Sequence, residues 1–217
     1  MGAFVKLPSF FGEDLVDVAE SYSYSEANLL ILKGDIDALK LKYPAEYAAL
    51  MSCVHNRDMR TPLQYAQDLV ASWLFEDYIM GGISDGGMKI VGAGADKQRE
   101  ILHSRSVSAH SDTRISFNGN SRLLEIMTDY GGYWSRNGVL DLRDSKYSEL
   151  RRTNSLFVGF SVEDSKFLLL DFSKDINATF ISCHHPYGGK PAYRIHCRAY
   201  LKDYSTQCLI EDLKRLI

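Results

Sequence analysis

The chain has 217 residues, of which 45% are hydrophobic and 12% aromatic, a composition typical of a compact globular protein. This composition excludes fibrous, mucin-like and low-complexity proteins. The formal net charge of −3 at pH 7 argues against a general nucleic-acid-binding protein, because such proteins carry a basic excess. A site-specific enzyme remains compatible with this charge, since its basic residues can be gathered in one cleft.

The longest nearly charge-free apolar run, from Leu69 to Phe75, is far shorter than the roughly 20 residues that span a bilayer. The cysteines form no C-x-x-C pair, so we expect reduced thiols. These features predict a soluble protein that is not exported and resides in the cytoplasm.

The first part of the chain has helical periodicity. From Ser25 to Met80 the apolar spacing predicts two or three helices, the last beginning at Thr61-Pro62 with a capping residue followed by proline. Gly81-Gly82 is expected to end that helix. Glu76 lies seven residues after Leu69 and so within about 20° of it around the helix, which predicts an inward-pointing carboxylate.

After Asp85 the pattern changes to short alternating or β-branched runs separated by turns. We expect strands at Lys89 to Ala93, Thr113 to Phe117, Arg122 to Thr128, Leu156 to Ser161, Phe167 to Phe172, Thr179 to His184 and Tyr193 to Tyr200, and helices at Ser145 to Arg152 and Gln207 to Ile217. The fold class is therefore α/β (α+β-like), with a central mixed β-sheet flanked by helices. We expect one domain, 1–217, with a helical part to about residue 80 and a sheet-containing core from about residue 81.

A tight turn at Asn118-Gly119-Asn120 predicts a hairpin that brings two carboxylates together. Asp112 stands at the start of the first strand and Glu125 lies within the second. Both faces of the second strand are apolar apart from Glu125, so this carboxylate is expected to be half-buried and to need a cation or a metal as partner.

Ser111-Asp112, followed thirteen positions later by Glu125-Ile126-Met127, resembles the core of the PD-(D/E)XK nucleases, the superfamily of many type II restriction endonucleases. The resemblance implies a restriction-endonuclease-like fold, Mg²⁺ bound by Asp112 and Glu125, and a helix carboxylate that Glu76 would supply. The family's lysine, two residues after the glutamate, is replaced by Met127.

Lys146 is the first lysine after the hairpin and lies at the strand-to-helix junction Leu140 to Tyr147. It is our preferred replacement for the missing lysine, whereas Asp129 or another carboxylate is the alternative. The catalytic set is then Asp112, Glu125, Lys146 and Glu76. A purely structural explanation of the hairpin carboxylates stays open, in which Asp112 caps a turn and Glu125 pairs with Arg114 or Arg122.

Basic residues that could contact DNA follow the same region. Arginine suits both guanine and phosphate, and the candidates around the hairpin in sequence are Lys97, Arg99, Arg105, Arg143, Arg151 and Arg152. A loop between two later strands adds His184, His185, Lys190 and Arg194, unless it is a plain hairpin connection. The same stretch offers an alternative, a zinc site formed by Cys183, His184, His185, His196 and Cys197. Neighbouring residues on a strand point to opposite faces, which argues against this site.

The sequence thus favours a Mg²⁺-dependent, site-specific endonuclease of double-stranded DNA, working as a homodimer on a short palindrome. A catalytically inactive DNA-binding or protein-interaction module on the same fold is the main alternative. A small-molecule enzyme is the third.

Overall fold

The computed structural model describes residues 2–52, 60–92, 111 and 113–217 of the chain. Residues outside these ranges include Asp112 and the segment that carries Lys97, Arg99 and Arg105. The described residues divide into two compact units, one up to Ile79 and one from Met80 onward.

The first unit is helical. Its described elements are α1 (Ala3–Phe11), α2 (Leu15–Ser21), α3 (Glu26–Lys33), α4 (Ile36–Lys42), α5 (Pro44–Ser52) and the first part of α6 (Pro62–Asp85). The expectation of two or three helices was too low. Gly34, with a φ of 72°, ends α3, the Asp35 side chain caps α4, and Pro44 starts α5, so a stretch with continuous helical periodicity is cut into short helices.

Helix α6 begins as predicted, but it is longer than predicted. The backbone N–H of Thr61 donates to Gln64 (2.9 Å) and that of Gln64 donates to the Thr61 hydroxyl (3.2 Å), a reciprocal cap. The helix does not end at Gly81-Gly82 but runs to Asp85. A Cβ on Gly82 would meet Thr206 Cγ2 at 2.8 Å, so this glycine permits close packing. No helix in the described parts of the chain is long and apolar enough to cross a membrane.

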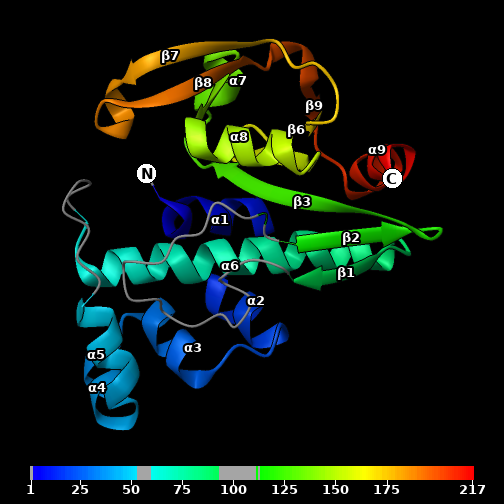
Figure 1. The fold of residues 1–217 in the computed structure, drawn as a ribbon. Helices are drawn as coiled ribbons and strands as arrows, with labels where there is room; N and C mark the ends of the chain where they lie inside the picture. Colours follow the sequence, from blue (N-terminus) through cyan, green and yellow to red (C-terminus); the bar gives the residue numbers. More distant parts are fainter. Residues whose placement is uncertain (1, 53–59, 93–110, 112) are drawn as a thin grey trace. The chain divides into compact units, whose positions relative to one another are not determined.

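The second unit contains two sheets, which confirms a mixed α+β fold (Figure 1). The larger, six-stranded sheet has the spatial order β1 (Lys89–Gly92), β2 (Thr113–Phe117), β3 (Asn120–Asp129), β5 (Leu156–Ser161), β6 (Lys166–Asp171) and β9 (Leu201–Asp203). Strands β3 and β5 are parallel and lie at its centre, and the other pairs are antiparallel. The smaller sheet has the order β4 (Val139–Arg143), β8 (Lys190–His196) and β7 (Ala178–His184), all antiparallel.

The chain between β3 and β5 forms α7 (Tyr133–Asn137), β4 and α8 (Asp144–Arg152). We did not predict α7, which is one short turn of helix. It is started by Asp129, whose carboxylate accepts from the backbone N–H of Trp134 at 2.7 Å. The predicted strand from Tyr193 to Tyr200 is also wrong in its bounds, because β8 ends at His196 and a short 3₁₀ turn, η3 (Arg198–Tyr200), precedes β9.

Helix α8 lies between β3 and the hairpin formed by β7 and β8 (Figure 1). Its Leu150 is fully buried in a core cluster to which both sheets contribute. The buried members of this cluster are Trp134, Leu140, Leu142, Leu150, Phe157, Leu168, Leu170, Phe172, Ile195 and Cys197. Helix α8 therefore packs between the two sheets, and side chains on its opposite sides contact different strands.

Helix α9 (Thr206–Leu216) closes the second unit, close to its predicted position. Leu209, Ile210 and Leu213 are buried on one side of it, as its amphipathic pattern predicts. Its last turn approaches β3, because Arg122 donates to the backbone carbonyl of Leu216 at 3.2 Å. The central strand of the large sheet is thus tied to α9 as well as to its neighbours.

Candidate active site

The predicted hairpin is present. Asn118 and Gly119 have φ values of 49° and 85°, which is the backbone conformation of a tight hairpin turn. The strands pair from Phe117 opposite Asn120 to Thr113 opposite Leu124. This register ends one residue before Glu125 and places Glu125 in the central part of β3.

Strand β3 presents two different faces. Leu124 and Ile126 are buried on one face, and by strand alternation Glu125 and Met127 lie on the other. Met127 packs against the core cluster that surrounds α8. Residue 127, where the resembling family has lysine, is therefore a packing position in this protein.

Glu125 forms an ion pair with Lys146, the third residue of α8. Lys146 Nζ lies 2.7 Å from Glu125 Oε1, and the two side chains are only 18% and 5% exposed. The sequence predicted that Lys146 reaches this carboxylate, and their distance agrees with that prediction. Removing both charges from water is costly, and their mutual attraction at this short distance offsets part of that cost.

The two arginines proposed as structural partners of Glu125 have other contacts. Arg122 is on the opposite face of β3 by alternation, and its guanidinium lies 2.6 Å from Asp171. Arg114 donates to the Ser121 hydroxyl at 3.4 Å. The structural explanation of Glu125 thus rests on Lys146 rather than on these arginines.

Asp112 lies outside the described residues, but both of its neighbours are described. Thr113 stands opposite Leu124 in the β2–β3 register. The Ser111 hydroxyl is 3.1 Å from that of Ser155, immediately before β5, and both serines are buried. The chain on either side of Asp112 is therefore held close to the part of β3 that carries Glu125.

Glu76 is half-buried on α6 and belongs to the first unit, whereas Glu125 belongs to the second. Its predicted part in a shared site stays a prediction. Asp129, the alternative to Lys146, accepts backbone hydrogen bonds from Gly131 (3.1 Å) and Trp134 (2.7 Å) and so serves the start of α7.

A second polar cluster lies on the smaller sheet. Asp141 on β4 stands opposite Arg194 on β8, and the two side chains form a paired contact: Arg194 Nε donates to Oδ1 and Nη2 donates to Oδ2, both at 2.8 Å. His184 Nε2 donates to the same Oδ2 at 2.8 Å. Burial alone would raise the pKa of Asp141, but the hydrogen bonds from Arg194 and His184 outweigh burial and lower it.

Two further contacts fix this cluster. The Tyr187 hydroxyl donates to the Asp141 backbone carbonyl at 2.6 Å, and the Arg143 guanidinium lies over the Tyr187 ring, 5.3 Å from its centroid. Burial and the nearby Asp141 carboxylate raise the pKa of Tyr187. Since Leu140, Leu142 and Ile195 point into the core from the same strands, alternation places Asp141, Arg143 and Arg194 on the outer face of the smaller sheet.

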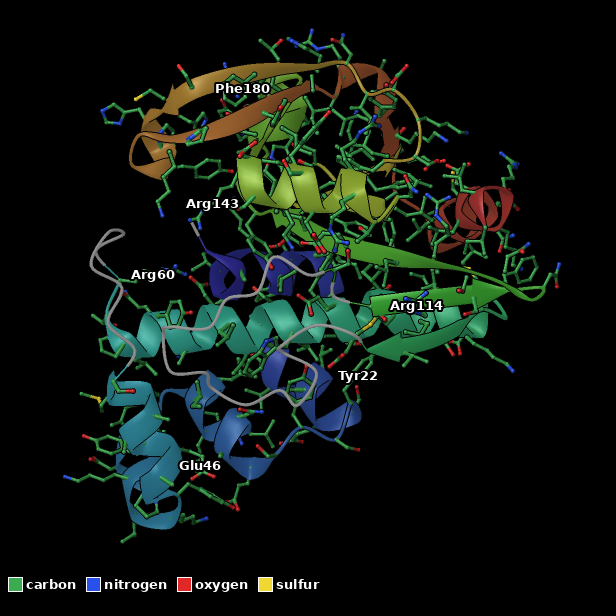
Figure 2. The ribbon with its side chains drawn as sticks, in the orientation of Figure 1. Tyr22, Glu46, Arg60, Arg114, Arg143 and Phe180 are labelled. Carbon is green, nitrogen blue, oxygen red and sulfur yellow. The ribbon has the colours of Figure 1, made fainter. Side chains whose placement is uncertain are left out.

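The predicted DNA-contacting residues thus fall into several groups. Arg143, Arg194, His185 and Lys190 are at least partly exposed on or beside the smaller sheet, and Arg143 is labelled at the start of α8 in Figure 2. His184 is buried beneath them. Arg151 donates to the backbone carbonyls of Phe172 and Lys174, so its guanidinium is used within the fold. Arg152 pairs with Glu149 on α8. Lys97, Arg99 and Arg105 lie outside the described residues.

The zinc alternative is not supported by the arrangement of its residues. No group of three or more His, Cys, Asp or Glu in the described part of the chain is arranged to hold a metal ion. His184 is bonded to Asp141, its strand neighbour Cys183 is exposed, and Cys197 is buried in the core cluster. Because adjacent strand residues point to opposite faces, these side chains do not converge.

Asp141 is not among the site residues predicted from the sequence. It is 53 positions from Arg194 and 43 from His184, so no local pattern joins them. The available signal was the alternation Leu140-Asp141-Leu142-Arg143, which puts an acid and a base on one face of a strand.

No protein-family model matches this chain, and no curated protein matches its sequence.

Proposed function

We propose that the chain is a Mg²⁺-dependent, site-specific endonuclease that hydrolyses phosphodiester bonds of double-stranded DNA in the cytoplasm. The observation that supports this most directly is the buried ion pair of Glu125 and Lys146 at 2.7 Å on the central strand of the large sheet. A carboxylate beside an ammonium group, with a second carboxylate, Asp112, thirteen positions earlier in the sequence, is a set of groups that suits phosphodiester hydrolysis.

The donor atoms around Glu125 suit Mg²⁺. Glu125 supplies carboxylate oxygens, which hard divalent cations prefer, whereas zinc would favour histidine or cysteine. Asp112 is the proposed second ligand, because its described neighbours Ser111 and Thr113 are held close to Glu125. The bound ion would supply charge neutralisation at the scissile phosphate and lower the pKa of a water molecule.

Lys146 is proposed to hold the attacking water. Its Nζ carries N–H donors that can bond the water oxygen or a phosphate oxygen while Glu125 binds the cation. Lys146 lies in the first turn of α8, and Leu150 of the same helix is buried in the core cluster. The packing of this helix therefore sets the position of the ammonium group. The lysine would thus act from a helix, and Met127 would remain a packing residue.

The proposed DNA-contacting surface is the outer face of the smaller sheet, with Arg143 and Arg194, together with Lys190 beside it. Lys97, Arg99 and Arg105 stay sequence-based candidates, because they lie outside the described residues. Arg143 directly precedes α8, only three residues before Lys146. A DNA backbone bound by Arg143 would therefore run toward the first turn of α8. A homodimer would present two such surfaces to a palindromic site.

The test is cleavage of supercoiled plasmid and phage DNA with Mg²⁺ and with EDTA. We expect discrete fragments with Mg²⁺ and none with EDTA. Glu125→Gln should remove cleavage and retain binding, while Glu211→Gln, at an exposed position on α9, is the matched control. Absence of any cleavage by the wild-type protein would contradict the proposal.

The main alternative is a catalytically inactive DNA-binding or interaction module. The observation that favours it is the same pair, because Lys146 neutralises Glu125 without a metal. A gel shift without cleavage under all metal conditions would support this alternative.

A further inference from the structure

The contact between Arg194 and Asp141 leaves part of the guanidinium unused. An arginine has five N–H donors in one plane. Asp141 takes one from Nε and one from Nη2, which leaves the second N–H of Nη2 and both of Nη1. Nη1 and Nη2 together form the outer edge of the guanidinium, so a second pair of parallel donors points away from Asp141.

Arg194 is more exposed than the other two side chains of this cluster. The Arg194 side chain is 37% exposed, whereas that of Asp141 is 10% exposed and that of His184 is 5% exposed. The Asp141 carboxylate and the His184 imidazole are thus buried, and they hold a partly exposed guanidinium. The orientation of Arg194 is further limited by the β4–β8 register, which places it directly opposite Asp141.

Asp141 is itself prevented from turning. His184 donates to Oδ2 and Tyr187 donates to the backbone carbonyl of the same residue. His184 Nδ1 is buried and has no hydrogen-bond partner among the described residues, so the ring is committed to Asp141 through Nε2. A carboxylate held from two sides fixes the plane of the arginine that it binds.

A fixed plane suits recognition of two parallel acceptors on the edge of a base. Guanine offers O6 and N7 as two parallel acceptors in the major groove, and the outer edge of an arginine matches them. Phosphates can be bound by a mobile cation and need no such orientation. Asp141 also offsets the positive charge of Arg194, which weakens its attraction for phosphate and leaves its geometry intact.

We propose that Arg194, oriented by Asp141, reads a guanine in the recognition sequence of the DNA. This inference rests on the proposed function, since it names a specificity-determining contact of that DNA-binding surface. Arg143 serves as the contrast. It is exposed and its guanidinium lies over the Tyr187 ring. No carboxylate of the described residues pairs with this guanidinium, which suits a phosphate contact.

The experiment selects bound duplexes from a pool with randomised sequence, without Mg²⁺, and then sequences them. The variants are Arg194→Lys, Asp141→Asn and Arg143→Ala, with Arg215→Ala on α9 as the control. Thermal unfolding of each variant checks that it folds. Cleavage by the wild-type protein is measured separately with Mg²⁺, so that binding specificity and catalysis are tested apart.

We expect the wild-type protein to select one or more guanines, and Arg194→Lys to lose about tenfold or more of the preference at one of them. Asp141→Asn should lose preference at the same position, while Arg143→Ala should weaken binding to all sequences alike and Arg215→Ala should change neither. An unchanged guanine preference in Arg194→Lys, or a uniform loss of binding, overturns the inference. Selection that changes as expected without any cleavage by the wild-type protein supports the inference and contradicts only the endonuclease proposal.

Discussion

Two carboxylates of the second unit, Glu125 and Asp141, are paired with cations in different ways. Glu125 faces a lysine through one contact of 2.7 Å on the inner side of β3. Asp141 holds an arginine through two parallel contacts and a histidine through a third, on the outer face of the smaller sheet. The pair of Glu125 and Lys146 joins a strand to a helix. The cluster of Asp141, Arg194 and His184 joins three strands of one sheet.

The difference bears on what each carboxylate can do. A lysine is a point charge on a flexible stem, and its ammonium group can shift when a metal or a phosphate arrives. An arginine bound side-on to a carboxylate is fixed in its plane. We therefore expect Glu125 to exchange partners during function and Asp141 to keep its partners throughout.

The largest effect is expected at Glu125. Glu125→Gln should reduce DNA cleavage by about 10³-fold, because a lost metal ligand removes several kcal/mol of charge stabilisation. DNA binding should stay equal or become tighter, since less negative charge faces the phosphates. Gel-based cleavage rates and binding curves measure both. Asp112→Asn should behave in the same way, and near wild-type cleavage by either variant would show that the metal ligands are assigned wrongly.

Lys146→Met should slow cleavage by about 10²-fold, the usual scale for a group that positions a reacting water. It should also lower the unfolding free energy by about 3 kcal/mol, because Glu125 stays buried without this ammonium group. The double variant Glu125→Gln/Lys146→Met should unfold with a smaller loss than the sum of the two single variants. A stability loss with an unchanged cleavage rate would make the pair purely structural.

Asp141→Asn should lower the unfolding free energy by about 1 to 3 kcal/mol at pH 7, since it weakens hydrogen bonds to a buried group. The pKa of Asp141 is lowered in the fold, so its carboxylate stabilises the protein above the ordinary aspartate pKa of about 3.9 and loses this effect as the pH falls below it. The difference in melting temperature between wild type and Asp141→Asn should therefore shrink on going from pH 7 to pH 3. A constant difference would show that the charge of Asp141 is not what stabilises the cluster.

The smallest effect is expected at Met127. Met127→Lys restores the residue type of the family that the sequence resembles, yet it should not increase cleavage, because Lys146 already places an ammonium group at Glu125. It should cost about 1 kcal/mol of stability through lost packing against the core cluster. A clear gain in rate would show that Lys146 does not serve as the cation of the site.

Much of the second unit could be predicted from local patterns. Strands β2 and β5 occur at their predicted bounds, and β3, β6, β7 and α8 lie within a few residues of them. These elements have clear alternation, or capping and turn residues, that act over a few positions. Helix α6 shows where such patterns fail: Gly82 resembles a helix end in the sequence, but it lies inside the helix because α9 packs closely against it.

The sequence by itself determined the hairpin, the alternation that puts Glu125 and Met127 on one face, and the helical start that carries Lys146, because each depends on neighbours along the chain. Only the tertiary structure decided that Lys146 reaches Glu125 and that Asp141 meets Arg194 and His184. Those contacts depend on which helix face packs on which strand and on the register between distant strands. The packing of α8 between the two sheets sets the contact between Lys146 and Glu125, and the β4–β8 register sets the pairing of Asp141 with Arg194.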